Sequence, residues 1–148
     1  MKRILFVLVI SMSSSCATVD VGSYIIPGET LDFDGHYYII DSKDDERGVA
    51  KIIKTVMSEK GIKISSGSKE DLPEGVNYTI EYGSQWQWDV TWYLLNFDFR
   101  VYNSESNLFI ASAHSLRTSL ERREPEHIVT ETLNTLFNFG EMYEKNNQ

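Results

Sequence analysis

Between residues 76 and 101 the chain alternates apolar and polar side chains with a period of two, the spacing of a half-buried β-strand. The apolar positions carry even numbers as far as Trp92 and odd numbers from Leu95 onward. A slip of one residue turns every later side chain to the opposite face of a sheet. We therefore expect a β-bulge near Tyr93 and Leu94, which bends a long strand and returns the apolar set to one face.

Turn signals and a change of period divide the rest of the folded region. Gly83-Ser84 allows a turn, and the apolar residues of 49–57 recur at three and four, as on one face of a helix. Asp41 or Ser42 can cap that helix, and Lys60-Gly61 closes it. The expected strands are 36–41, 76–82, 86–101 and 108–116, with 62–64 as an optional edge strand, and the expected helices are 42–61 and 122–140.

This order, β-α-β-β-β-α, predicts an α+β fold. Strands that follow one another closely pair as antiparallel neighbours, and each expected helix has one apolar face to bury. We expect a two-layer sandwich, in which two helices cover one face of a mostly antiparallel sheet.

The first sixteen residues have the order of a bacterial export signal. Lys2 and Arg3 precede a run of seven apolar residues, 4–10, and small residues follow up to Cys16. A transmembrane helix needs about 20 apolar residues to cross a bilayer of about 30 Å, so this run is too short to span. We interpret 1–15 as a signal peptide.

Cys16 is the only cysteine of the chain, and its position resembles the bacterial lipoprotein processing site. The resemblance implies that Cys16 becomes the mature N-terminus and carries acyl chains such as palmitate, whose buried methylenes contribute about 0.8 kcal/mol each to anchoring. Ser15 fits the pattern, whereas Ser13 stands where the family usually has leucine. Ala17 replaces the aspartate typical of inner-membrane retention, which implies the outer membrane. A plain secretory signal with an unmodified cysteine is the alternative.

Removal of 1–15 leaves 133 residues, 12 of them basic and 22 acidic, so the mature net charge is −10. Such a surface argues against nucleic acid and against electrostatic docking on anionic lipid. Residues 17–35 mix glycine, proline and acids without a sustained period. This favours a tether that lets the domain stand off the membrane, and residues 24–26 are those through which the tether could dock. The predicted organisation is a signal peptide over 1–15, a lipidated cysteine and tether over 16–35, and one α+β domain over 36–148.

The segment 78–95 resembles a pattern of uncharacterised bacterial envelope lipoproteins. In that family a strand ending in tyrosine precedes W-x-W-D-x-x-x-Y-L, here residues 86–94, and a later strand and a helix opening Pro125-Glu126 complete the similarity over about 36–140. The order of elements is also similar to small lipoproteins that assist lipopolysaccharide assembly and to auxiliary lipoproteins of envelope ABC transporters. This second likeness concerns architecture, because fold does not imply function. The family implies no activity for any residue here.

The tryptophan-rich segment supplies the candidate binding residues. A face that mixes tryptophan with valine is typical of a core, so we expect a central strand packed against the helices, with Asp89 on its other face. The alternative is a stacking surface for glycan or a groove for a hydrophobic partner, assisted by amphipathic tyrosines. The candidate residues are Trp86, Trp88, Trp92, Tyr93 and Asp89.

Catalytic and metal-binding patterns are weak in this sequence. Asp89 as a catalytic acid would need a second carboxylate, such as Glu81 or Asp98; as a structural acid it would pair with Arg100 or Arg117. The three histidines, His36, His114 and His127, are far apart and lack metal-ligand spacing. We expect no enzyme, no metal and no cofactor.

The sequence therefore predicts a non-catalytic outer-membrane lipoprotein that faces the periplasm. Its partners would be the membrane, through Cys16, and an unidentified envelope protein, for which it would act as an accessory or adaptor subunit. The alternative is a protein that binds lipid, glycan or a peptidoglycan fragment through the tryptophan-rich strand.

Overall fold

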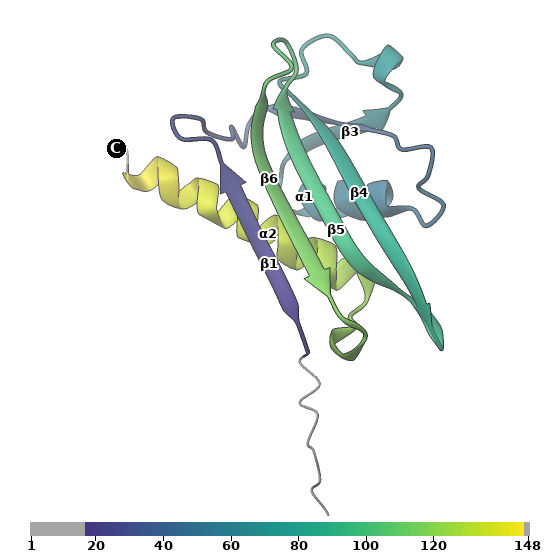
Figure 1. Ribbon diagram of the computed structural model, residues 1–148. Helices are drawn as coiled ribbons and strands as arrows, with labels where there is room; N and C mark the ends of the chain where they lie inside the picture. Colours follow the sequence, from purple (N-terminus) through teal and green to yellow (C-terminus); the bar gives the residue numbers. More distant parts are fainter. Residues whose placement is uncertain (1–16, 147–148) are drawn as a thin grey trace, which may run out of the picture.

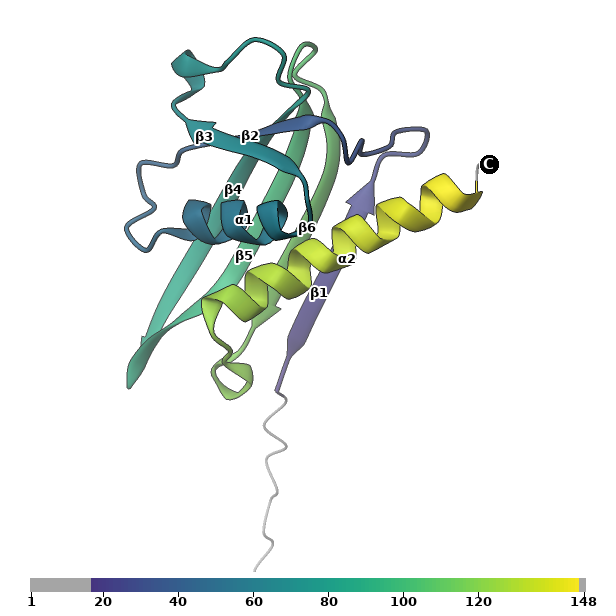
Figure 2. The same cartoon turned by 180° about the vertical axis from the view of Figure 1, so that it is seen from behind.

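The computed structural model describes residues 17–146, with side chains placed through residue 137. A six-stranded sheet carries two helices on one face, which confirms the α+β prediction (Figures 1 and 2). The strands are β1 Val19–Ile25, β2 His36–Ile40, β3 Lys63–Gly67, β4 Tyr78–Asp89, β5 Thr91–Asn103 and β6 Phe109–Arg117; the helices are α1 Val49–Glu59 and α2 Pro125–Asn146, with short 3₁₀ turns at Lys69–Asp71 and Ser119–Glu121.

The strands lie in the order β1-β6-β5-β4-β2-β3. The pairs β1–β6, β6–β5 and β5–β4 are antiparallel, whereas β2 pairs in parallel with both β4 and β3. The parallel β2–β3 pair is possible because α1 provides the crossover between them. The sheet is thus mostly antiparallel. Strand β3 lies at its edge, where 62–64 was the optional edge strand, whereas β1 was not predicted.

Residues 19–25, interpreted from sequence as part of a tether, form β1 instead. Every residue of β1 pairs with β6, from Val19 opposite Arg117 to Ile25 opposite Ala111. Gly22 lies opposite His114, and a Cβ there would stand 2.8 Å from the imidazole ring. A side chain at position 22 would therefore require the half-exposed His114 ring to shift.

The β-bulge is confirmed, but the turn lies elsewhere. Gln85 pairs with Asn96 and Trp86 with Leu94, so Leu95 is the extra residue. Gly83-Ser84 lies inside β4, and the chain reverses at Val90. The expected strand over 86–101 is therefore two strands of one hairpin, because the period-two pattern continues across a turn without interruption.

Helix α1 begins later than expected and is capped by a different acid. Its first residue is Val49, and the Asp45 carboxylate accepts hydrogen bonds of 2.8 Å from the backbone N–H groups of Val49 and Ala50. Asp41 and Ser42 lie outside the helix, which corrects the predicted cap. The predicted apolar face is confirmed, since Val49, Ile53, Val56 and Met57 are buried.

The core lies between the sheet and the two helices. The central strand β5 contributes Phe97, Phe99 and Val101, all fully buried. The buried guanidinium of Arg117 on β6 forms an ion pair with Glu131 of α2, which ties the long helix to the sheet. The faces that meet are those that the period-two and helical patterns predicted.

Ile25→Ala should destabilise the protein by about 2–5 kcal/mol, because Ile25 is buried against the core and truncation leaves a cavity. Denaturant unfolding followed by tryptophan emission measures this. Its neighbour Tyr24, half exposed, is the control, and Tyr24→Ala should cost about 0.5 kcal/mol or less. Equal, small effects of both substitutions would restore the tether interpretation.

Candidate functional site

The turn end of the β4–β5 hairpin brings all five predicted binding residues together. Cross-strand pairing places Trp88 directly opposite Trp92, with ring centroids 5.7 Å apart at an interplanar angle of 63°. Trp86 lies two residues along the same face, which is the face that bears the helices. Asp89 and Tyr93 lie on the opposite face, as the alternation predicted for Asp89.

The expectation that the tryptophans form a buried central strand is wrong for two of them. Trp88 is 59% exposed and Trp92 is 51% exposed, and only Trp86 packs partly against the core. The reason is that the hairpin extends beyond the strands β6 and β2 that pair with it. Strand β6 pairs with β5 only from Asn96 onward, and β2 pairs with β4 only over 78–80, so the turn end has no further strand beside it.

Arg47 completes the tryptophan face. Its guanidinium carbon lies 4.8 Å from the Trp86 ring centroid and 4.7 Å from that of Trp92, within cation–π range of both. Arg47 belongs to the loop before α1, which reaches the hairpin only in the folded chain. No local sequence signal could have paired it with residues of β4 and β5.

Asp45 holds this loop in place. Besides capping α1, its carboxylate accepts a 2.9 Å hydrogen bond from the Tyr82 hydroxyl of β4. Burial alone would raise the pKa of Asp45, but the N–H groups of Ala50 and Val49 and the Tyr82 hydroxyl outweigh it and lower that pKa. Burial, together with the charge of Asp45, raises the pKa of Tyr82, which keeps its hydroxyl a donor.

Arg122 supports the other face of the hairpin. It donates hydrogen bonds to the Asp89 carboxylate at 2.7 Å, to the Asp89 carbonyl at 2.8 Å and to the Ser119 carbonyl at 2.8 Å. Its guanidinium also lies 5.1 Å from the centroid of the Tyr93 ring. Asp89 is therefore the paired structural acid that was expected, but its partner is Arg122 rather than Arg100 or Arg117.

The carboxylates considered as catalytic partners of Asp89 are distant from it. Glu81 lies eight residues back on β4, and Asp98 pairs across from Gly83, six residues back. At about 3.3 Å per strand residue these separations are roughly 26 and 20 Å. Asp98 instead accepts a 3.0 Å hydrogen bond from the Asn96 amide. Neither Glu81 nor Asp98 therefore forms, together with Asp89, a pair of carboxylates that could act on one bond.

The three histidines occupy separate environments. His36 lies with Nε2 2.7 Å from the Ser65 hydroxyl, and burial and then Lys63 lower its pKa. His114 Nε2 is 3.6 Å from Asp20, and His127 belongs to α2. Within residues 17–146, no three histidine, cysteine or acidic side chains gather as metal ligands. Cys16 lies outside the described residues.

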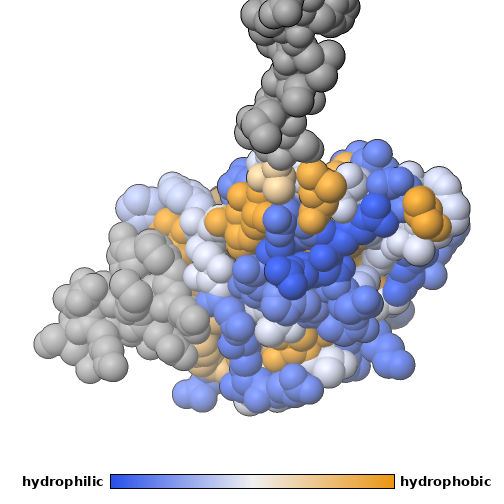
Figure 3. Space-filling model, turned by 90° about the horizontal axis from the view of Figure 1, so that it is seen from below, coloured by the Kyte–Doolittle hydropathy of each residue, from blue (hydrophilic) through white to orange (hydrophobic). Residues whose placement is uncertain are grey.

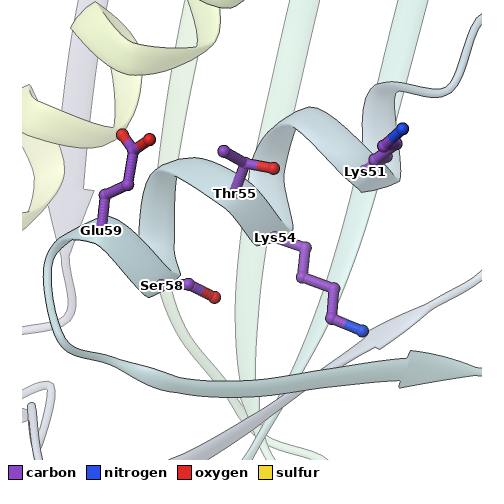
Figure 4. Close-up of a pocket in the computed structure, with 5 residues that line it drawn as sticks. All are labelled: Lys51, Lys54, Thr55, Ser58 and Glu59. Atoms are coloured by element: carbon purple, nitrogen blue, oxygen red, sulfur yellow. The ribbon is translucent and has the colours of Figure 1, made fainter.

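A shallow depression of about 600 Å³ crosses the exposed surface of α1. Its lining side chains point in different directions rather than toward one point, as Figure 4 shows for Lys51, Lys54 and Glu59. Binding pockets usually have a few convergent polar groups. This depression therefore supplies no site. The hairpin end remains the candidate functional site.

Comparisons with known proteins give the fold a precedent. No protein-family model and no curated protein matches the chain. Two structures of the PelC dodecamer from Paraburkholderia phytofirmans are similar to it, with TM-scores of 0.63 and 0.61 and identities of 14% and 13%. Each alignment covers 80% of this chain, and 98% and 96% of the respective PelC chains. The likeness is one of fold.

Two proteins of Acinetobacter baumannii match more distantly. TolB gives a TM-score of 0.44 at 16% identity, over 77% of this chain and 30% of TolB. A minor lipoprotein gives 0.37 at 12% identity, over 74% of this chain and 95% of the lipoprotein. Likenesses this distant support no argument about this chain. Separately, none of the helices in the described part of the chain has the length and apolar character to cross a bilayer.

Asp45→Asn should remove a pH-dependent part of the stability. The folded state holds the pKa of Asp45 below its ordinary value of 3.8, so its stabilising effect is present above that value and is lost as the pH falls through the folded pKa. The difference in unfolding free energy between wild type and Asp45→Asn should shrink from about pH 5 to about pH 2. Urea unfolding measures it. The exposed neighbour Asp44 is the control, and a pH-independent difference for Asp45→Asn would contradict the assignment.

Proposed function

We propose that this protein is a lipoprotein of the bacterial outer membrane, anchored by acyl chains on Cys16 with its α+β domain in the periplasm. The domain acts as a non-catalytic accessory or adaptor subunit of an envelope assembly. The observation that carries the proposal is the order of the first sixteen residues: two cations, seven apolar residues, small residues and then the single cysteine.

The start of the fold supports this anchoring. Strand β1 begins at Val19, three residues after the expected lipidation site, so only a short segment would join the domain to the anchor. Asp89, considered from the sequence as a catalytic acid, is instead paired with Arg122 and lies far from Glu81 and Asp98.

The edge of the sheet suggests how a partner could dock. Strand β1 is at the end of the strand order, so its backbone is paired with β6 along only one of its two edges. Figure 1 shows no strand beside its outer edge, although α2 crosses behind β1 and extends past it. A free edge of seven residues offers backbone N–H and C=O groups to an added strand, a common mode of peptide recognition.

In-cell crosslinking of the full-length protein, tagged after Gln148 and recovered from membranes, tests the proposal. We expect the wild type in the outer-membrane fraction with a recurrent protein partner, and we expect Cys16→Ser to release the protein and lose that partner. Wild-type protein that is soluble and unanchored would refute the lipoprotein assignment. Anchored protein without a partner would refute the accessory role alone.

The exposure of Trp88 and Trp92 favours one second candidate, binding of lipid, glycan or a peptidoglycan fragment at the hairpin. Contact of such a ligand with the exposed indole rings would change their fluorescence emission. Titration with such ligands should shift the tryptophan emission of the wild type. A Trp88→Phe, Trp92→Phe double variant is the control, since it retains Trp86 as reporter and should not respond. No shift with any of these ligand classes would exclude the candidate.

A further inference from the structure

Exposed apolar side chains are concentrated at one end of the domain. Strand β6 ends there beside the start of β1, the 3₁₀ turn Ser119–Glu121 follows, and Arg122 links this turn to the β4–β5 hairpin (Figure 1). We call this the apolar end; its large exposed apolar residues are Val19, Trp88, Val90, Trp92, Leu116 and Leu120. Only Tyr24 and Leu108 of that class lie elsewhere among the described residues.

The chain enters the domain at this same end. Thr18 is already fixed, because its N–H donates to the Thr118 hydroxyl and its carbonyl accepts from the Thr118 N–H, both at 3.1 Å. Only Ala17 separates Thr18 from Cys16. Since consecutive Cα atoms are about 3.8 Å apart, a separation of two residues allows at most about 7.6 Å of chain between a fixed residue and an anchor. Figure 3 views this end and shows hydrophobic patches on both sides of the point where the described chain begins, within an otherwise largely hydrophilic surface.

Val90 is an unusual residue for the tip of a hairpin. Its φ is 63°, a left-handed conformation that glycine, asparagine and aspartate adopt readily and that a β-branched side chain resists. The side chain is 80% exposed, so packing within the domain does not explain a valine at this position. A strained, exposed apolar residue points to a contact outside the domain.

The chemistry of the apolar end matches a bilayer surface. Indole rings such as those of Trp88 and Trp92 favour the boundary between headgroups and acyl chains, and valine and leucine favour the apolar side of it. The nearby Arg122 is neutralised by Asp89. Because the mature protein is strongly acidic, attraction to anionic lipid does not drive this contact, and burial of apolar surface must.

We propose that the apolar end lies in the periplasmic leaflet of the outer membrane, with Trp88, Val90 and Trp92 at the level of the lipid headgroups and upper acyl chains. The inference rests on the proposed lipid anchor at Cys16. With one residue between the anchor and the fixed Thr18, the domain sits directly on the bilayer. The opposite end, where β5 and β6 are joined near Leu108, points into the periplasm.

Two single-cysteine positions at opposite ends of the domain provide the test. Full-length Val90→Cys and Leu108→Cys variants, purified as lipoproteins, are labelled with an environment-sensitive fluorophore; acylated Cys16 does not react, and unlabelled wild type verifies this. The proteins are reconstituted into phosphatidylethanolamine and phosphatidylglycerol vesicles that contain brominated acyl chains. Both positions are exposed and apolar, at 80% and 65%, so they form a matched pair.

We expect bromine to quench the probe at position 90 severalfold more than the probe at position 108, with little change at high salt because the contact is apolar. Protein that floats with the vesicles but shows equal or no quenching at the two positions overturns the inference and leaves the anchor intact. Protein that does not float, or wild type that takes up label, refutes the anchor itself.

Two further results complete the test. A probe at position 90 that is shielded from water but not quenched by bromine would show that protein, such as a second copy, covers the apolar end, and would also overturn the inference. Val90→Asn separates folding from membrane contact, because asparagine accepts the left-handed conformation. It should unfold at the same or a higher denaturant concentration than wild type, yet reduce the quenching of Trp88 and Trp92 by brominated lipid.

Discussion

The β4–β5 hairpin keeps its apolar side chains on one face because its register shifts at one point. Leu95 is an extra residue in β5, and it places Leu94 and Phe97 on the same face although they are three residues apart. Without this bulge, the apolar residues on one side of Leu95 would turn away from the helices. Both helices pack against the face that the bulge keeps continuous, so one inserted residue decides what the core contains.

The same hairpin extends beyond the strands beside it, and its length decides which residues remain accessible. Near the turn, support comes from two arginines on opposite faces: Arg47 lies between Trp86 and Trp92, and Arg122 holds Asp89. Arg47 is positioned in turn by the loop that Asp45 fixes. The exposed tryptophans are therefore held by local contacts while their outer surfaces stay free, an arrangement suited to contact with another surface.

Strand β1 changes how the N-terminal region relates to the domain. Its sequence lacks a sustained period, yet all its residues pair with β6, and Gly22 lies beside the His114 ring. Pairing with β6 then brings Val19 next to Arg117 and fixes the point where the chain enters. In place of the expected tether, only Ala17 and Thr18 of the described residues precede β1.

By itself, the sequence determined the features that depend on neighbours along the chain. These are the period-two face of β4 and β5, the bulge beside Leu94, the apolar face of α1, and the signal-like order that ends at Cys16. Three features emerge only in the folded chain: Trp88 and Trp92 are exposed, Asp89 pairs with Arg122 rather than with Arg100 or Arg117, and residues 19–25 form a strand. The physical reason is that burial and partner choice depend on where neighbouring strands end, and those strands come from distant parts of the chain.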